Sequence, residues 1–141
     1  MARNQWRRER RLWNEVRIDT IDARQYDDRW GGYINPSHHA MIERFIDLCP
    51  PGAHILDAAC GTGKYWSLLL EHGFSVTGID QSQQMLQRAH AKFPDVSVQH
   101  LGLQELNLKD AFDAVMCMDA MEFVFPEDWP VVLASLLDIS T

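Results

Sequence analysis

The chain has 141 residues, of which 46% are hydrophobic and 23% are charged, a composition typical of one globular domain with a buried core. It contains no run of eighteen apolar residues and no signal-peptide pattern, so we expect neither a membrane-spanning nor a secreted protein, and we predict a cytoplasmic location. The cysteines Cys49, Cys60 and Cys117 lack C-x-x-C spacing, which argues against a disulfide framework and against a zinc site, and no metal is expected.

The net charge of −7 is distributed unevenly along the chain. Residues 1–18 hold six arginines and two glutamates and so carry +4, whereas the remaining residues carry −11. Trp6 and Trp13 lie at helical spacing among these arginines and predict an amphipathic helix over 4–20, with the tryptophans packed on the body. A basic segment can bind phosphates, but we expect it to pair with the acidic body, and nucleic acid is not an expected partner.

Two segments precede the middle of the chain. Residues 23–33 are aromatic and charged and contain Gly31-Gly32, and their residue types alone predict a surface loop anchored by Tyr26 and Trp30. Asn35 followed by Pro36 predicts the N-cap and first turn of a helix that ends before Pro50. The apolar stripe of that helix consists of Met41, Ile42, Phe45, Ile46 and Leu48.

Residues 55–63 predict a strand followed by a tight turn. Two apolar residues lead into Asp57, small residues that include Gly61 and Gly63 follow, and a helix is predicted over 64–72. Small residues let a backbone approach a ligand closely, and the first N–H groups of a helix can donate to polar or negative groups. A nucleotide-like ligand therefore fits this turn, and the alternative is a glycine-rich connection with no ligand.

The chain then alternates between strands and helices. The predicted elements are a strand over 74–79, a helix over 82–93, strands over 96–100 and 111–118, and a helix over 127–137. Asp80 follows the first of these strands, 23 residues after Asp57, close to the spacing of a ribose-binding acid in dinucleotide-binding folds. A carboxylate at that position can accept hydrogen bonds from two ribose hydroxyls. Its alternative role is to cap the following helix.

Two blocks resemble class I S-adenosylmethionine-dependent methyltransferases. The stretch Asp57-Ala-Ala-Cys-Gly-Thr-Gly63 is similar to their first motif, with Ala59 at the position of the first glycine, and the stretch from Gly78 to Ala89 is similar to their second. The resemblance covers roughly residues 20–141. It implies an α/β, Rossmann-like fold: an open, mostly parallel twisted sheet in strand order 3-2-1-4 with helices on both faces. It also implies S-adenosyl-L-methionine as cofactor and a small-molecule substrate.

The resemblance implies roles for particular residues. It places Asp57, Ala59, Gly61 and Gly63 around the methionine moiety and Asp80 on the ribose. It also implies that the segment with Tyr26 closes over the cofactor as a lid. The expected cofactor-binding residues are Tyr26, Asp57, Ala59, Cys60, Gly61, Gly63, Asp80, Gln81, Met85, Leu103 and Met118.

The family pattern is broken where the adenine is recognised. Members often have, after the third strand, an aspartate that bonds the adenine amino group, and Gly102 stands at that position here. The remaining alternatives are the Leu103 backbone, Gln104, Glu105 and apolar contact from Met85.

Residues 111–118 resemble the fourth strand of the family, and Asp119 and Glu122 follow at the rim where open parallel sheets bind ligands. Either acid could serve as a base or orient a substrate, and either could instead cap the next helix. The segment lacks the Asn/Asp-Pro-Pro-aromatic signature of enzymes that methylate amino groups of nucleic-acid bases or glutamine, which disfavours those substrates.

We expect two parts in the chain. Residues 1–35 form an N-terminal helix and lid segment, and residues 36–141 form a Rossmann-like cofactor-binding domain. The family normally continues with three more strands. A four-stranded sheet would leave its fourth strand as an exposed edge, so we expect a missing C-terminal segment or a second copy in a homo-oligomer to cover it.

Two other functions compete with methyl transfer. A nicotinamide-dependent dehydrogenase needs G-x-G-x-x-G, and Trp66 stands where its third glycine would be. A regulatory module could bind S-adenosylmethionine without catalysis.

Overall fold

The computed structural model describes residues 5–6, 8–10, 12–13, 23–30, 32–108, 112–118, 120, 124 and 126–139. These residues form a four-stranded parallel sheet in the order β3-β2-β1-β4. Its strands are β1 (His54–Ala58), β2 (Ser75–Asp80), β3 (Ser97–His100) and β4 (Ala114–Met116). The predicted α/β fold and strand order are confirmed, although β4 is shorter than the strand predicted over 111–118.

The helices are α2 (Ala23–Trp30), α3 (Pro36–Leu48), α4 (Trp66–Glu71), α5 (Gln83–Lys92) and α6 (Trp129–Ile139), with 3-10 turns η1 (Leu103–Glu105) and η3 (Pro126–Asp128). The predicted N-cap at Asn35 is confirmed, and Ser82 caps α5 in the same way. The Asn35 side chain accepts a hydrogen bond from the Ser37 N–H at 2.8 Å, and Ser82 Oγ accepts one from the Met85 N–H at 3.3 Å. The helix predicted over 64–72 begins at Trp66 instead, because the backbone is still turning at Gly63, whose φ is +77°.

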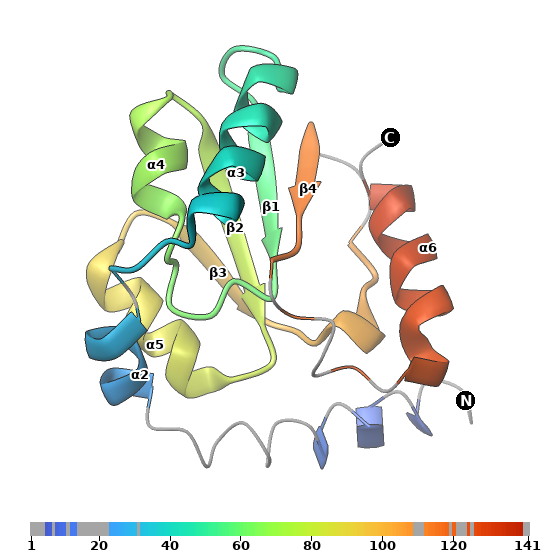
Figure 1. The fold of residues 1–141 in the computed structure, drawn as a ribbon. Coiled ribbons are helices and arrows are strands. Elements are labelled where there is room, and N and C mark those ends of the chain that lie inside the picture. The colour runs from blue at the N-terminus through green and yellow to red at the C-terminus, as the bar shows by residue number, and fades with distance from the viewer. Residues whose placement is uncertain are drawn as a thin grey trace.

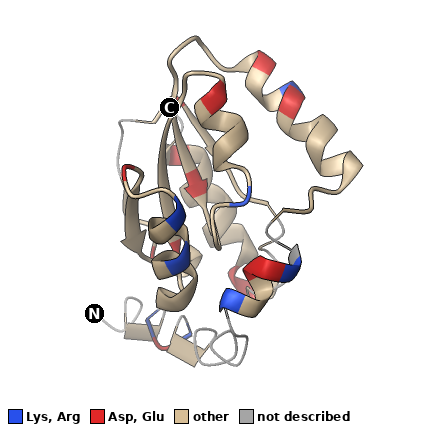
Figure 2. Ribbon diagram, turned by 90° about the vertical axis from the view of Figure 1, so that its left-hand side faces the viewer, with Lys and Arg blue, Asp and Glu red and all other residues tan. Residues whose placement is uncertain are grey.

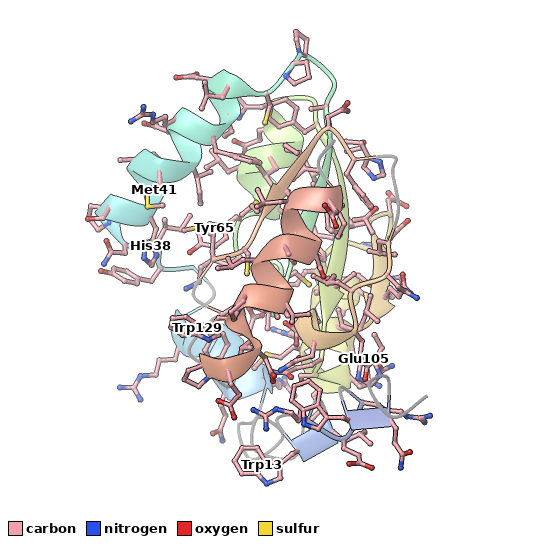
Figure 3. All side chains as sticks on the ribbon, turned by 90° about the vertical axis from the view of Figure 1, so that its right-hand side faces the viewer. Trp13, His38, Met41, Tyr65, Glu105 and Trp129 are labelled. Carbon is pink, nitrogen blue, oxygen red and sulfur yellow. The ribbon has the colours of Figure 1, made fainter. Side chains whose placement is uncertain are left out.

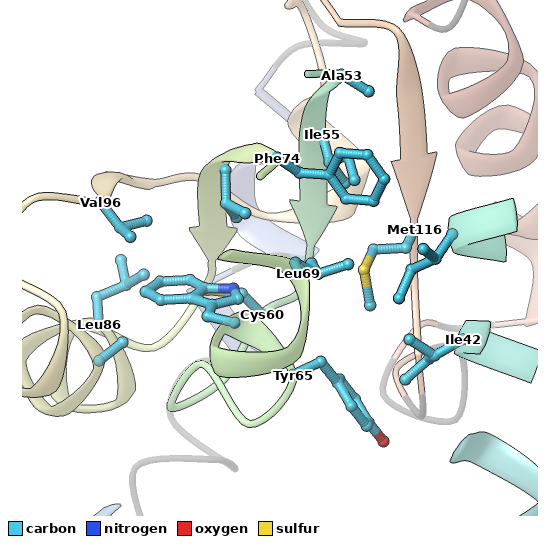
Figure 4. Packing of buried hydrophobic residues seen from close by; sticks show 14 residues of the cluster. Ile42, Ala53, Ile55, Cys60, Tyr65, Leu69, Phe74, Leu86, Val96 and Met116 are labelled. Carbon is cyan, nitrogen blue, oxygen red and sulfur yellow. The ribbon is translucent and has the colours of Figure 1, made fainter. Parts of the chain in front are cut away.

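Helices cover both faces of the sheet (Figure 1). Successive strand residues point to opposite faces, so Ile55 belongs to the core beneath α3, α4 and α5, whereas Leu56 belongs to the core beneath η1 and α6. Figure 4 shows the first core, in which Phe74 and Met116 pack between the strands and the helices. The carboxyl ends of all four strands lie at one edge of this layered structure. No helix among the described residues combines the length and apolar character needed to cross a bilayer.

The predicted apolar stripe of α3 is only partly correct. Ile42 and Ile46 are buried and Phe45 is half-buried, but Met41 is 60% exposed and Leu48 is 78% exposed. Ile42 and Ile46 are one turn apart and so share the face that meets the sheet, and Met41 and Leu48 lie outside that face.

The N-terminal segment contacts the body by charge rather than by tryptophan packing. Trp6 and Trp13 are 41% and 52% exposed, so their predicted burial is wrong, and Figure 3 shows Trp13 at the periphery. Arg10 Nε instead donates to Asp128 Oδ2 at 2.7 Å, and a second guanidinium nitrogen lies 2.6 Å from a Glu127 oxygen in η3. The guanidinium also lies over the Trp6 ring, 5.0 Å from its centre. The predicted pairing of an N-terminal arginine with the acidic body is thus confirmed at Arg10. Residues 4, 7, 11 and 14–20 of the predicted helix lie outside the described part.

Residues 23–30 of the segment that was interpreted as a loop or lid form helix α2, so the loop prediction is wrong for these residues. The Asp27 side chain of α2 is buried and accepts hydrogen bonds from Arg88 Nε at 2.8 Å and from Lys92 Nζ at 2.6 Å, both on α5. Burial alone would raise the pKa of Asp27, but the hydrogen bonds from Lys92 and Arg88 outweigh it, and the pKa is lowered. The charged positions of the two helices can be followed in Figure 2. This contact fixes α2 beside the carboxyl ends of the strands.

Candidate functional site

A cavity of about 330 Å³ lies at the carboxyl end of the sheet. It is lined by Tyr26, Asp57, Ala59, Cys60, Gly61, Thr62, Lys64, Tyr65, Asp80, Gln81, Met85, Leu101, Leu103, Gln104, Met118, Ala120 and Val124. Ten of the eleven predicted cofactor-binding residues therefore share one cavity wall. The exception is Gly63, which lies beneath the Trp66 ring: a Cβ atom added at Gly63 would be 2.7 Å from that ring.

The turn after β1 repeatedly adopts left-handed backbone conformation. The φ angle is +59° at Ala59, +56° at Gly61 and +77° at Gly63, so each motif position that the family gives to glycine has a positive φ. Ala59 is the only described non-glycine residue with such an angle, and its short side chain keeps the strain near 1–2 kcal/mol. A Cβ atom added at Gly61 would meet no atom within 4 Å, so this backbone faces open space at the cavity wall.

Asp80 connects the second strand to that turn. Its Oδ2 accepts a hydrogen bond from the Gly61 N–H and its Oδ1 accepts one from the Ser82 N–H, both at 2.8 Å. Burial raises the pKa of Asp80, and the two hydrogen bonds offset only part of this increase. Each carboxylate oxygen can accept a second hydrogen bond, so the side chain can hold the turn and still bind two hydroxyl groups.

Asp57 lies at the other side of the turn and is 2% exposed. Its Oδ2 accepts a hydrogen bond from Trp66 Nε1 at 2.8 Å. Burial raises the pKa of Asp57 to about 7; the Trp66 hydrogen bond opposes this effect and the negative charge of Asp80 adds to it. The structure therefore places a carboxyl group that titrates near neutral pH in the wall of the cavity.

Sequence reasoning did not select several lining residues, among them Thr62, Lys64 and Tyr65. Tyr65 is buried, and its hydroxyl lies 3.5 Å from His38 Nδ1 of α3. Both side chains are labelled in Figure 3. Lys64 and Tyr65 directly follow the glycine turn in the sequence. This adjacency was the signal that could have identified them as lining residues. Among the described residues, no group of three or more His, Cys, Asp or Glu side chains is arranged to hold a metal ion.

Three of the four alternatives for base recognition lie at the cavity. Met85, Leu103 and Gln104 line it, whereas Glu105 does not. Gln104 is 3% exposed, and it lies in η1, which follows β3.

The candidate catalytic acids Asp119 and Glu122 lie outside the described residues. Their neighbours Met118, Ala120 and Val124 line the cavity. A catalytic role for either acid stays a prediction.

Residues 55–140 match a family model described as a methyltransferase domain, which is more than half of the chain. The chain therefore belongs to the class I S-adenosylmethionine-dependent methyltransferases, as its motifs predicted. S-adenosylmethionine is the cofactor that defines this family.

Curated relatives carry methyltransferase names. The ubiquinone biosynthesis O-methyltransferase of Coxiella burnetii is 36% identical over 104 residues, an alignment that covers 64% of this chain and 40% of the relative. A dTDP-3-amino-3,6-dideoxy-alpha-D-glucopyranose N,N-dimethyltransferase of Streptomyces fradiae is 36% identical over 69 residues, covering 49% of this chain and 27% of the relative. The chain thus spans 40% or less of the length of these two relatives.

Solved structures share the fold. Magnesium protoporphyrin IX methyltransferase from Synechocystis, crystallised with bound S-adenosylmethionine, superposes with a TM-score of 0.74 at 19% identity, covering 93% of this chain and 72% of that one. A complex of DhpI with S-adenosylhomocysteine superposes with a TM-score of 0.71 at 21% identity, covering 96% of this chain and 64% of that one. At these identities the likeness shows a common fold.

Proposed function

We propose that the protein binds S-adenosylmethionine in the cavity and transfers its methyl group to a small molecule. The observation that carries this proposal is the hydrogen bond of 2.8 Å between the Gly61 N–H and the Asp80 carboxylate. It joins the turn after β1 to the end of β2 at the wall of the cavity, where an open glycine backbone and a buried acid can both face one ligand.

The lining residues fit the parts of the cofactor. Asp80 keeps acceptor capacity for the two ribose hydroxyls, and Gly61 leaves room for the methionine moiety beside Asp57. Met85 and Leu103 offer apolar contact to a flat base. Tyr26 reaches the cavity from α2, which the buried Asp27 holds against α5, and this arrangement supports the predicted lid role of Tyr26.

When bound, S-adenosylmethionine would supply a sulfonium methyl group for transfer to the lone pair of a nucleophile, and sulfur would keep the electron pair of the broken bond. The part of the chain described here can bind and orient the reactants, and positioning of this kind is a large component of rate enhancement. A base is needed only if the nucleophile arrives protonated, and Asp119 and Glu122 are the proposed candidates.

The small-molecule substrate class is supported by the relatives, whose names describe O-methylation in ubiquinone biosynthesis and N-methylation of a nucleotide-linked amino sugar. Because these names cover two acceptor atoms, the proposal specifies neither. A cytoplasmic location and a homo-oligomeric partner at the β4 edge stay predictions.

Calorimetric titration with S-adenosylmethionine and S-adenosylhomocysteine tests the binding step, and a methyl-transfer assay against a panel of metabolites tests the reaction. Binding of both ligands together with transfer to at least one metabolite is expected. Binding without transfer to any acceptor would favour the regulatory-module alternative, and the absence of binding would contradict the proposal.

A further inference from the structure

The Gln104 carboxamide is buried at the cavity without a hydrogen-bond partner. The residue is 3% exposed and lines the cavity, and neither Oε1 nor Nε2 is hydrogen-bonded to any atom of the described structure. Buried polar side-chain atoms are paired in the large majority of cases, because an unpaired donor or acceptor loses its hydration without compensation. Two unpaired atoms on one amide therefore indicate a ligand that supplies both an acceptor and a donor.

The place of Gln104 in the fold specifies which part of the ligand it meets. The segment that carries it leaves β3 beside Asp80, because the Leu101 N–H donates to the Asp80 carbonyl at 3.0 Å. Gln104 then follows within one 3-10 turn, next to the apolar lining residue Leu103. A ligand whose ribose is held by Asp80 can thus extend its base over Leu103 and Met85 toward the amide.

We propose that Gln104 recognises the nucleobase of the cofactor, an inference that rests on the proposed function. The carboxamide oxygen accepts from the exocyclic amino group of adenine, and the carboxamide N–H donates to the adjacent ring nitrogen. A primary amide carries these two groups side by side, which makes it a bidentate partner for adenine. The competing candidates supply less: Met85 is apolar, Glu105 does not line the cavity, and the backbone N–H of Leu103 offers a donor without an adjacent side-chain acceptor.

The test is a double-mutant cycle between Gln104 and the amino group of the ligand. Wild-type protein and Gln104→Met are titrated with S-adenosylhomocysteine and with its purine riboside counterpart, which lacks the exocyclic amino group. The affinity of the wild-type protein should fall by about tenfold when the amino group of the ligand is removed. Gln104→Met should bind the adenine ligand about tenfold more weakly than wild type does. Its affinity should then change by less than about twofold when the amino group is removed. Gln104→Leu repeats the test with a different apolar side chain, and Gln99→Met on the exposed part of β3 is the matched control and should bind as wild type.

A stability measurement separates recognition from a structural role. Because Gln104→Met removes two unpaired polar atoms from a buried site, the ligand-free variant should unfold at the same temperature as wild type or higher. Equal weakening of both ligands, or a Gln104→Met affinity within about twofold of wild type, would overturn the inference and leave the proposed function standing. Failure of the wild-type protein to bind S-adenosylhomocysteine would overturn the proposed function and this inference with it.

Discussion

The indole N–H of Trp66 donates a hydrogen bond to the carboxylate of Asp57 at 2.8 Å, and both side chains are buried. This bond joins the first helical residue of α4 to β1 across the glycine turn. It supplies a donor to an acid that would otherwise be isolated from water beside a second acid, Asp80. The same tryptophan that departs from the dinucleotide-binding fingerprint thus stabilises the glycine turn after β1.

The first prediction concerns the titration of Asp57, whose pKa is raised to about 7 by burial. An acid with a higher pKa in the folded protein than in the unfolded chain binds its proton more tightly when folded. Its contribution to stability is therefore largest at low pH and is lost as the pH rises through 7. Between about pH 5 and pH 8 the free energy of unfolding should fall by roughly 3 kcal/mol from this group.

Asp57→Asn provides the control for that titration, because its amide oxygen can still accept the Trp66 hydrogen bond and cannot ionise. Denaturant unfolding of both proteins across this pH range measures the difference. The variant should gain stability relative to wild type as the pH rises. A constant difference at all pH values would show that Asp57 does not titrate near neutrality.

The second prediction concerns the fit of Trp66 against the sheet. A Cβ atom added at Gly78 of β2 would overlap the Trp66 ring and would lie 2.9 Å from Cys60 Sγ. Gly78→Ala should therefore lower the free energy of unfolding by about 1–3 kcal/mol, the usual cost of overpacking a rigid core. Gly32→Ala, where an added Cβ atom meets nothing within 4 Å, is the control for a glycine change without a clash. Equal stability of the two variants would mean that the ring can move aside.

Much of this architecture could be predicted because its signals are local. Asn35 before Pro36, Ser82 after Asp80, and the small-residue turn each specify a backbone conformation within a few residues. The motif spacing also predicted that Asp57 and Asp80 lie close together, because the carboxyl ends of parallel strands meet at one edge of the sheet. Both residues line the cavity.

The features that escaped prediction depend on contacts between distant segments. Helical spacing of Trp6 and Trp13 shows that they share a face, but not whether the body offers that face an apolar partner. Gln104 was one of several alternatives for adenine recognition, and the choice among them depends on the burial of its amide, which the sequence does not show because the residue type alone favours a solvent-exposed position.

The third prediction separates backbone strain from obstruction of the cavity. Gly61 and Gly52 have φ angles of +56° and +72°, and an added Cβ atom at either position meets nothing within 4 Å. Valine at either position should therefore be similarly strained. Only Gly61→Val should abolish S-adenosylmethionine binding, because only Gly61 lines the cavity. Calorimetry on both folded variants checks this, and full affinity in Gly61→Val would place the ligand elsewhere.

The fourth prediction concerns the attachment of α2. Asp27→Asn removes the charge that Arg88 and Lys92 share, leaving two cationic groups beside a neutral amide. The free energy of unfolding should fall by about 2 kcal/mol, and S-adenosylmethionine should bind more weakly because Tyr26 is carried by the same helix. Asp28→Asn is the matched control, since its 65% exposed carboxylate lies 3.5 Å from Arg88 and should contribute under about 1 kcal/mol. Equal losses in the two variants would contradict the anchoring role of Asp27.

The last prediction decides between two roles for the basic N-terminal segment. Asp128 has a side chain that is 3% exposed, and its Oδ2 is paired with Arg10. Arg10→Ala should therefore cost roughly 2–3 kcal/mol of stability by leaving a buried carboxylate uncompensated, whereas Arg8→Ala, at an exposed position, should cost less than about 0.5 kcal/mol.

The same two variants test the nucleic-acid alternative. If the arginines instead contact phosphates, a generic RNA should bind with an affinity that falls steeply with salt, and each arginine removed should reduce the salt slope by about one. We expect no such binding, because Arg10 is already engaged by Asp128 and Glu127 and the body carries a net negative charge that repels a polyanion. A salt-dependent RNA affinity that both substitutions weaken equally, with no loss of stability in Arg10→Ala, would reverse this assignment and move the substrate proposal from a small molecule toward nucleic acid.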